Sequence, residues 1–430
     1  MAHTPARHAV LAAGGDATNK GALAIITLLF FMWGLLTSLN DVLIPHLKAV
    51  YTLTYVQAML VQFCFFGAYF LVSLPAGMLI RRIGYQRGAV AGLTIAALGC
   101  TLFYPAATGG YALFLLAFFV LASGITVLQV AANPYVTVLG AARTASSRLT
   151  LTQAFNALGT TVGPALGGML ILSGTALTTG QFAQLPGADQ LVHRAAEAAT
   201  VQGPYLVLAA VLLMLAFAFA MVRLPIIAHE ESEPTSGGMR LSILAHRHLV
   251  LGVAALFLYV GGEVSIGSFL ISFMEDGSIA ALTPAAAAGY VSFYWGGAMV
   301  GRFIGFAAMR HVTPGKALMC NAGGAIVLIL FAILGSGRPA MWALLAVGLC
   351  NSIIFPTIFS MALHGLGKLT GQGSGLLCMG IVGGALVPFA QGYVADMAGL
   401  QLSFAVPALC YTFVMYYGWK YVGLYRTGLA

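Results

Sequence analysis

Twelve apolar segments, each long enough to cross a lipid bilayer, constrain the fold of this chain more than any other feature of its sequence. A membrane-spanning helix needs about 20 apolar residues, because the hydrocarbon core is about 30 Å thick and a helix rises 1.5 Å per residue. The composition agrees, since 60% of the residues are hydrophobic and only 7% are charged. We therefore expect an all-α membrane protein with twelve transmembrane helices. The segments cover residues 22–46, 55–80, 88–107, 111–137, 149–173, 203–224, 249–274, 284–309, 316–335, 339–363, 373–396 and 401–424.

The basic residues between the segments predict the orientation in the membrane. With a cytoplasmic N-terminus, sixteen of the nineteen Lys and Arg lie on the cytoplasmic side, and only Lys48, Arg194 and Arg338 lie outside. This distribution follows the positive-inside rule. The net charge of +8 then reflects topology and does not indicate a nucleic-acid partner. We expect a multi-pass protein of the bacterial inner membrane with both termini in the cytoplasm.

A polar stretch divides the chain into two halves. Residues 225–248 are rich in Glu, Ser, Pro and Gly and are typical of a cytoplasmic linker. We expect a six-helix half at 22–224, a second at 249–424, and short cytoplasmic tails at 1–21 and 425–430.

The two halves share an internal repeat. One glycine and proline pattern recurs with the same spacing in the fifth and eleventh segments, at Gly159, Pro164 and Gly168 and at Gly383, Pro388 and Gly392. A parallel repeat of this kind is typical of transporters whose substrate site lies between the halves. We therefore expect two pseudo-symmetric halves with a site at their interface.

Two carboxylates lie within the apolar segments. Asp41 follows Asn40 towards the far end of the first segment, and Glu263 lies among small residues in the seventh. An Asp at mid-membrane costs roughly 2.5 to 3.5 kcal/mol, so such a residue normally faces a protein interior or an aqueous cavity. The alternative for Asp41 is a position in the headgroup layer. We expect a functional role for both carboxylates.

Four amides lie on the fourth and fifth segments. Gln129 and Asn133 are one helical turn apart, and Gln153 and Asn156 are three residues apart, so the members of each pair share a face. Amides both donate and accept hydrogen bonds, which is what sugar hydroxyls require. The alternative is that they hold neighbouring helices together, at about 0.6 kcal/mol per bond.

Candidates in the second half are fewer. Tyr294 and Trp295 could stack on the apolar face of a sugar ring, although aromatic residues in membrane helices more often pack against other helices. Asn351 and Pro356 place a polar group and a kink in the tenth segment.

Six motifs, spread over nearly the whole chain, carry a family resemblance. They are Ser-Leu-Asn-Asp-Val-Leu-Ile-Pro (38–45), Leu-Gln-Val-Ala-Ala-Asn-Pro-Tyr-Val-Thr (128–137), Gln-Ala-Phe-Asn (153–156), Tyr-Val-Gly-Gly-Glu-Val (259–264), Tyr-Trp-Gly-Gly-Ala-Met-Val-Gly-Arg-Phe (294–303) and Phe-Pro-Thr-Ile-Phe-Ser (355–360). Together they resemble the fucose/glucose/galactose permease family of the major facilitator superfamily, and most closely its bacterial glucose/galactose transporters. The resemblance implies the two-half major facilitator fold and inward transport of a sugar with a coupling cation.

The resemblance also implies roles for individual residues. Asp41 matches the family's acidic coupling residue of the first helix, and Asn156 matches a pocket asparagine of the fifth. Gln129 is a departure, because the fucose permeases place a glutamate there. This departure argues against fucose specificity and against a proton relay through two carboxylates.

The sequence leaves the coupling ion open between Na⁺ and H⁺. A proton needs one titratable group, for which Asp41 or Glu263 could serve. Sodium needs several oxygen ligands, which Asp41, Gln129 and Asn133 could supply. Because Gln129 cannot carry a proton but keeps an oxygen, the sequence favours Na⁺, with Glu263 then accepting hydrogen bonds from the sugar or stabilising the closed state.

We therefore expect cation-coupled uptake of a glucose- or galactose-type hexose by alternating access, in a monomer without a cofactor. Alternatives are a proton symporter for fucose, N-acetylglucosamine or mannose, a sugar uniporter, or a drug exporter, whose cavity should be more apolar. A sugar sensor or an intramembrane enzyme would need a soluble signalling domain, or a nucleophile with its base or a metal cluster. The sequence shows none of these features.

Overall fold

The computed structural model describes residues 10–11, 20–51, 55–170, 201–222, 226–227, 241–282 and 284–424. Some side chains inside these ranges lie outside the description, including those of 38–50 and 164–170. Within the described residues, nine helical segments are long and apolar enough to cross a membrane. The described apolar part of the first helix, Gly21–Thr37, is shorter.

The first half contains the helices before the linker. They are α1 (Lys20–Tyr51), α2 (Tyr55–Ile83), α3 (Tyr85–Gly109), α4 (Tyr111–Val138), the 3-10 turn η1 (Ala142–Thr144), α5 (Ala145–Leu170) and α8 (Gln202–Met221). Single glycines with positive φ connect α2 to α3 and α3 to α4: φ is 83° at Gly84 and 85° at Gly110. Residues with a side chain rarely adopt this conformation, so glycine permits both sharp reversals.

The second half begins with η2 (Leu241–Ala245), α9 (Arg247–Glu275), α10 (Pro284–Ala308) and α11 (Pro314–Leu334). Its last three membrane segments are each built from two helices. These are α12 (Gly337–Asn351) with α13 (Ile354–Leu363), then α14 (Thr370–Met379) with α15 (Gly383–Ala398), and finally α16 (Leu400–Ser403) with α17 (Ala405–Lys420). Two 3-10 turns, η3 (Gly367–Leu369) and η4 (Gly380–Val382), precede α14 and α15. Counted over the described ranges, the bundle has twelve membrane segments, as the sequence predicts.

The break between α12 and α13 lies where the sequence predicts a kink. α12 ends at Asn351 and α13 begins at Ile354, two residues before Pro356. Proline has no N–H for the carbonyl four residues earlier, so the hydrogen-bond ladder is interrupted there. The break leaves the Asn351 side chain at a helix end in the interior of the half.

Equivalent helices cross in the same way in the two halves. A Cβ built on Gly159 of α5 would lie 2.2 Å from the carbonyl oxygen of Phe31 in α1. A Cβ on the corresponding Gly383 of α15 would lie 2.0 Å from the carbonyl oxygen of Phe257 in α9. Both contacts need a residue without a side chain, so the glycines of the sequence repeat mark equivalent helix crossings.

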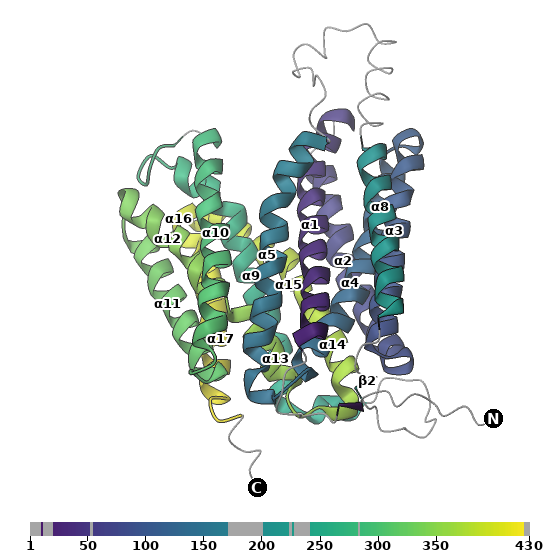
Figure 1. Cartoon of the computed structure of the whole chain (residues 1–430). Coiled ribbons are helices and arrows are strands. Elements are labelled where there is room, and N and C mark those ends of the chain that lie inside the picture. Colours follow the sequence, from purple (N-terminus) through teal and green to yellow (C-terminus); the bar gives the residue numbers. More distant parts are fainter. Residues whose placement is uncertain are drawn as a thin grey trace, which may run out of the picture.

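The halves meet side by side, with α5 next to α10 and α2 next to α14 (Figure 1). We call the end of the bundle that carries the first residues of α1 and the last residues of α17 the terminal end. There the halves are joined by hydrogen bonds: Ser146 Oγ lies 2.5 Å from Ser360 Oγ, and Ser374 Oγ donates to the Val130 carbonyl at 3.0 Å. Helix α14 also packs closely against α2 through its glycines, since a Cβ on Gly375 would lie 2.6 Å from a carbonyl oxygen of α2. The bundle is therefore closed at its terminal end.

Outside the bundle, β1 (Val10–Leu11) pairs in parallel with β2 (Ile226–Ile227). Val10 lies opposite Ile226 and Leu11 opposite Ile227. This short pairing joins the segment before α1 to the segment after α8.

Candidate functional site

The first half presents a group of buried polar side chains on α4 and α5. Gln129 and Asn133 are 1% and 0% exposed, and Gln153 is 5% exposed. Residues on the opposite side of α4 pack on α3, where Cβ atoms built on Gly92 and Gly124 would touch the partner helix. Gln129 and Asn133 thus lie on the side of α4 away from α3, as their shared face predicts.

Several polar atoms of these side chains lack hydrogen-bond partners among the residues that the structure describes. The unpartnered atoms are Gln129 Oε1, Asn133 Nδ2 and Oδ1, and Gln153 Nε2, together with Oγ1 of Thr150 on α5. A buried polar atom left unpaired costs about 1 to 3 kcal/mol. Such atoms are normally satisfied by water or by a ligand. This set, which we call the unpaired amide group (Gln129, Asn133, Thr150, Gln153), offers both donors and acceptors to a polar ligand.

Asn156 is placed differently from the other amides. Its Nδ2 donates to the Phe30 carbonyl of α1 at 2.9 Å, next to the close crossing of α1 and α5. A Cβ on Gly34 of α1 would lie 2.0 Å from the Asn156 carbonyl oxygen. Asn156 therefore holds α1 against α5, and its Oδ1 is the atom left for a ligand.

Asn40 and Asp41 lie within α1, but their side chains fall outside the part of the chain that the structure describes. Their predicted roles remain predictions. Among the described residues, no group of three or more His, Cys, Asp or Glu could hold a metal ion. The amide oxygens Gln129 Oε1 and Asn133 Oδ1 are the buried oxygens on α4 that could take part in a cation site.

The second half contains a hydrogen-bonded cluster around Glu263 of α9. The Tyr259 hydroxyl, one turn earlier, lies 2.8 Å from Glu263 Oε1 and 3.0 Å from the Asn351 carbonyl oxygen. The Tyr294 hydroxyl of α10 donates to the Glu263 carbonyl at 3.2 Å. Glu263 is thus anchored on one carboxylate oxygen while its side chain stays partly exposed.

Asn351 connects this cluster to two more helices. Its Nδ2 donates to the Tyr294 hydroxyl at 2.7 Å, and its Oδ1 accepts from the Tyr411 hydroxyl of α17 at 2.5 Å. Both ends of the amide are therefore occupied by protein groups. We call Tyr259, Glu263, Tyr294, Asn351 and Tyr411 the Glu263 cluster; its bonds orient the carboxylate instead of leaving the amide free for a ligand.

Trp295, predicted to stack on a sugar, is 46% exposed. Its ring makes an edge-on contact with Tyr294 at 5.1 Å between centroids and lies against Gly267, where a Cβ would be 3.2 Å from the indole. The neighbouring Tyr294 is fully buried. Of the two aromatic residues, Trp295 is thus the one with a free surface.

Three further residues belong to this region and were missed from sequence. Tyr259 and Tyr411 supply hydroxyls to the Glu263 cluster, but tyrosines in apolar helices carry no distinctive pattern. Arg302 of α10 interacts electrostatically with Glu263, and its buried Nε has no hydrogen-bond partner within the described ranges. Arg302 lies inside the eighth apolar segment, where a charge is costly, so its position indicates a functional or structural role. The sequence-based prediction placed it only among the cytoplasmic basic residues.

Comparison with known proteins identifies the family. Residues 26–381 match the family model of the Major Facilitator Superfamily. The "Glucose/galactose transporter" of Brucella abortus is 56% identical over 92% of this chain and 93% of its own. The "L-fucose-proton symporter" of Escherichia coli K12 is 35% identical over 91% of each chain.

The fold is also similar to that of a solved transporter. A crystal structure of FucP "in the outward conformation" superposes with a TM-score of 0.87 at 32% identity, over 93% of this chain and 98% of that one. FucP is the fucose:proton symporter of E. coli. The chain therefore belongs to the major facilitator superfamily, within the family of the bacterial glucose/galactose transporters and L-fucose–proton symporters.

Proposed function

We propose that this protein takes up a hexose of the glucose/galactose type across the bacterial inner membrane, coupled to a cation, by alternating access of its two halves. The observation that carries the proposal is the 56% identity, over 92% of the chain, to a protein named a glucose/galactose transporter. A transport role agrees with the superfamily, and the protein is not an enzyme.

The polar groups of the two halves support a sugar ligand. The unpaired amide group leaves two carbonyl oxygens, two amide nitrogens and a hydroxyl without partners in a buried setting. Sugar hydroxyls donate and accept in the same way and would replace the missing partners. From the second half, the Glu263 carboxylate would accept hydrogen bonds from the sugar and Trp295 would cover its apolar face. Asn40, Asn156, Tyr294 and Asn351 would complete or support the pocket.

The closed terminal end supports the alternating-access step. We assign this end to the cytoplasm, because most basic residues flank it. The bonds between the halves, Ser146 with Ser360 and Ser374 with the Val130 carbonyl, would then close the cytoplasmic exit while the site is loaded from outside. Release inside requires these bonds to break and the halves to rock apart.

We propose Na⁺ as the coupling ion, held by Asp41 and Gln129. The supporting observation is that Gln129 Oε1 and Asn133 Oδ1, one turn apart on α4, are buried oxygens to which none of the described groups donates. A second candidate is H⁺, because relatives at 35% and 29% identity are named proton symporters. Asp41 would then carry the proton.

Uptake of labelled glucose and galactose into proteoliposomes tests the proposal. We expect an imposed sodium gradient to drive accumulation with the proton gradient collapsed. Accumulation driven only by a pH gradient would make H⁺ the coupling ion. Absence of uptake of either hexose under both gradients, in liposomes that take up another sugar, would refute the substrate assignment.

Asp41→Asn tests the coupling residue. The change removes the charge and keeps the shape, so we expect folded, inserted protein that no longer concentrates sugar. Accumulation at the wild-type level would exclude Asp41 from coupling. Sugar exchange without a gradient is the control, because it shows that the pocket is still formed.

A further inference from the structure

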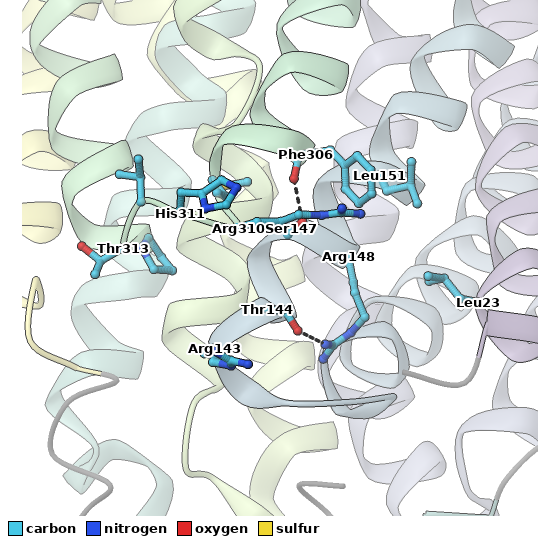
Figure 2. A pocket seen from close by; sticks show the side chains of 13 residues that line it. Leu23, Arg143, Thr144, Ser147, Arg148, Leu151, Phe306, Arg310, His311 and Thr313 are labelled. Atoms are coloured by element: carbon cyan, nitrogen blue, oxygen red, sulfur yellow. Dashed lines mark hydrogen bonds between the residues drawn. The ribbon is translucent and has the colours of Figure 1, made fainter. Parts of the chain in front are cut away.

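A basic cavity of about 530 Å³ lies at the terminal end, at the boundary between the two halves. Figure 2 shows that Arg143 and Thr144, from η1, line it on the side of the first half, while Arg310, His311 and Thr313 come from the end of α10 and the connection to α11. Ser147 of α5 donates to the Phe306 carbonyl of α10 at 2.8 Å across the cavity. Neither the sugar site nor the coupling residues belong to this cavity.

The charge of the cavity is one-sided. Among the described residues that line it are three arginines and a histidine, and none of them is Asp or Glu. Arg148 is 3% exposed, and its guanidinium donates hydrogen bonds to the backbone carbonyls of Val136, Thr137, Gly140 and Ala141. Arg143 and Arg310 are exposed, and the Arg310 guanidinium lies 4.4 Å from the centre of the Phe306 ring. The described lining therefore attracts an anion and offers no carboxylate to pair with a ligand's cation.

The start of α11 adds to this attraction. Thr313 is the residue before the first turn, and its side chain makes no capping hydrogen bond. Its Oγ1 is buried, and no described residue is its hydrogen-bond partner. Free backbone N–H groups at a helix start carry partial positive charge, so they favour negative groups nearby.

An apolar groove continues from the basic cavity. The groove encloses about 610 Å³ between α1 and α5 and shares Leu23 and Leu151 with the cavity. Its other lining residues are Ala24, Thr27, Leu28, Phe31, Phe155 and Leu158. From Leu23 to Phe31 the groove follows α1 for about 12 Å at 1.5 Å per residue. Leu28 and Leu158 are 49% and 36% exposed, so the groove opens to the surroundings of the bundle, which is the bilayer.

We propose that the basic cavity and the apolar groove together bind one anionic phospholipid. Its phosphate lies between Arg143 and Arg310, and one acyl chain runs along the groove between α1 and α5. The two parts match a lipid, because a soluble phosphate compound has nothing to fill the groove. The described lining residues are basic and include no acid, which favours phosphatidylglycerol or cardiolipin over lipids with an amine headgroup.

The site depends on conformation, since both halves line it while the terminal end is closed. A ligand shifts a protein towards the state that it binds more tightly. The lipid therefore stabilises the closed terminal end and links membrane composition to the transport cycle. This consequence does not depend on which sugar or ion is carried.

Native mass spectrometry of the full-length protein in detergent tests the proposal, with phosphatidylglycerol, phosphatidylcholine and glycerol 3-phosphate as probes. We expect phosphatidylglycerol to bind and phosphatidylcholine to bind weakly. Arg143→Ala and Arg310→Ala should each weaken phosphatidylglycerol binding about fivefold, which corresponds to the roughly 1 kcal/mol of one basic residue near an anionic surface. Both arginines are exposed, so the variants should keep the wild-type melting temperature.

The matched control is Arg87→Ala, an exposed arginine in the first turn of α3 that does not line the cavity. Ala24→Phe fills the groove and should weaken lipid binding without changing the charge. Equal binding of the two lipids, equal losses in Arg87→Ala and the cavity variants, or full competition by glycerol 3-phosphate would each overturn the proposal. The last outcome would identify a site for soluble phosphate compounds.

Discussion

Replacing Gln129 with leucine tests whether this side chain binds the ligand or only stabilises the fold, because the two roles predict opposite effects. The Gln129 side chain is 1% exposed, and its Oε1 has no partner in the described part of the chain. Leucine has a similar volume and no polar atoms, so Gln129→Leu removes an unpaired oxygen without opening a cavity. We therefore expect the free protein to fold and to be at least as stable as the wild type.

The effect on ligand binding should have the opposite sign. A ligand hydroxyl or ion that binds Gln129 forms a hydrogen bond or an ion–oxygen contact in a desolvated site. Without the Gln129 side chain this ligand group stays unpaired, at a cost of about 1 to 3 kcal/mol in binding free energy. This corresponds to a dissociation constant that is larger by roughly 5- to 150-fold. Isothermal titration of purified protein with glucose and galactose, at fixed sodium concentration, measures it directly.

Gln391 supplies a matched control. It is also buried with an unpartnered Oε1, but it lies on α15 and its Nε2 donates to Ser403 Oγ at 3.3 Å. Gln391→Leu should leave sugar affinity unchanged. Wild-type affinity in Gln129→Leu, or the same loss in both variants, would refute the assignment of Gln129 to the pocket.

Three further predictions concern stability and conformation. Asn351→Leu removes the acceptor of the Tyr411 hydroxyl and one of two partners of the Tyr294 hydroxyl, which still donates to the Glu263 carbonyl. One buried hydroxyl left unpaired costs about 1 to 3 kcal/mol, so the melting temperature should fall clearly; an unchanged value would contradict the account of the Glu263 cluster. Gly375→Ala places a Cβ 2.6 Å from a carbonyl oxygen of α2, so the terminal end should open and disulfide formation between cysteines introduced at Ser146 and Ser360 should decrease. Burial and a neighbouring histidine lower the pKa of His364 below its ordinary 6.5. Its contribution to stability is then complete above pH 6.5 and is lost as the pH falls through the lowered pKa, so His364→Gln should flatten the thermal stability profile between about pH 7 and 5.

The helices could be predicted from the sequence because a bilayer imposes a length and a composition on each span. The twelve segments, the break near Pro356 and the equivalence of Gly159 with Gly383 are all found in the structure. The site was less predictable, because an amide in an apolar helix gives the same signal whether it binds a ligand or another helix. The structure distinguishes Gln129, whose oxygen is unpaired, from Asn156, whose nitrogen is bonded to α1.

The sequence by itself determined the all-helical membrane fold, the division into two related halves and the family, since these depend on hydropathy, spacing and motifs that are local in the chain. Only the tertiary structure decided which polar groups are already satisfied. Glu263, Asn351 and Tyr411 come from three helices far apart in sequence, and their bonds form only when α9, α12 and α17 pack together. The same holds for the basic cavity, whose arginines belong to different halves. Hydrogen bonding and charge act over a few ångströms in space, and that proximity is set by packing.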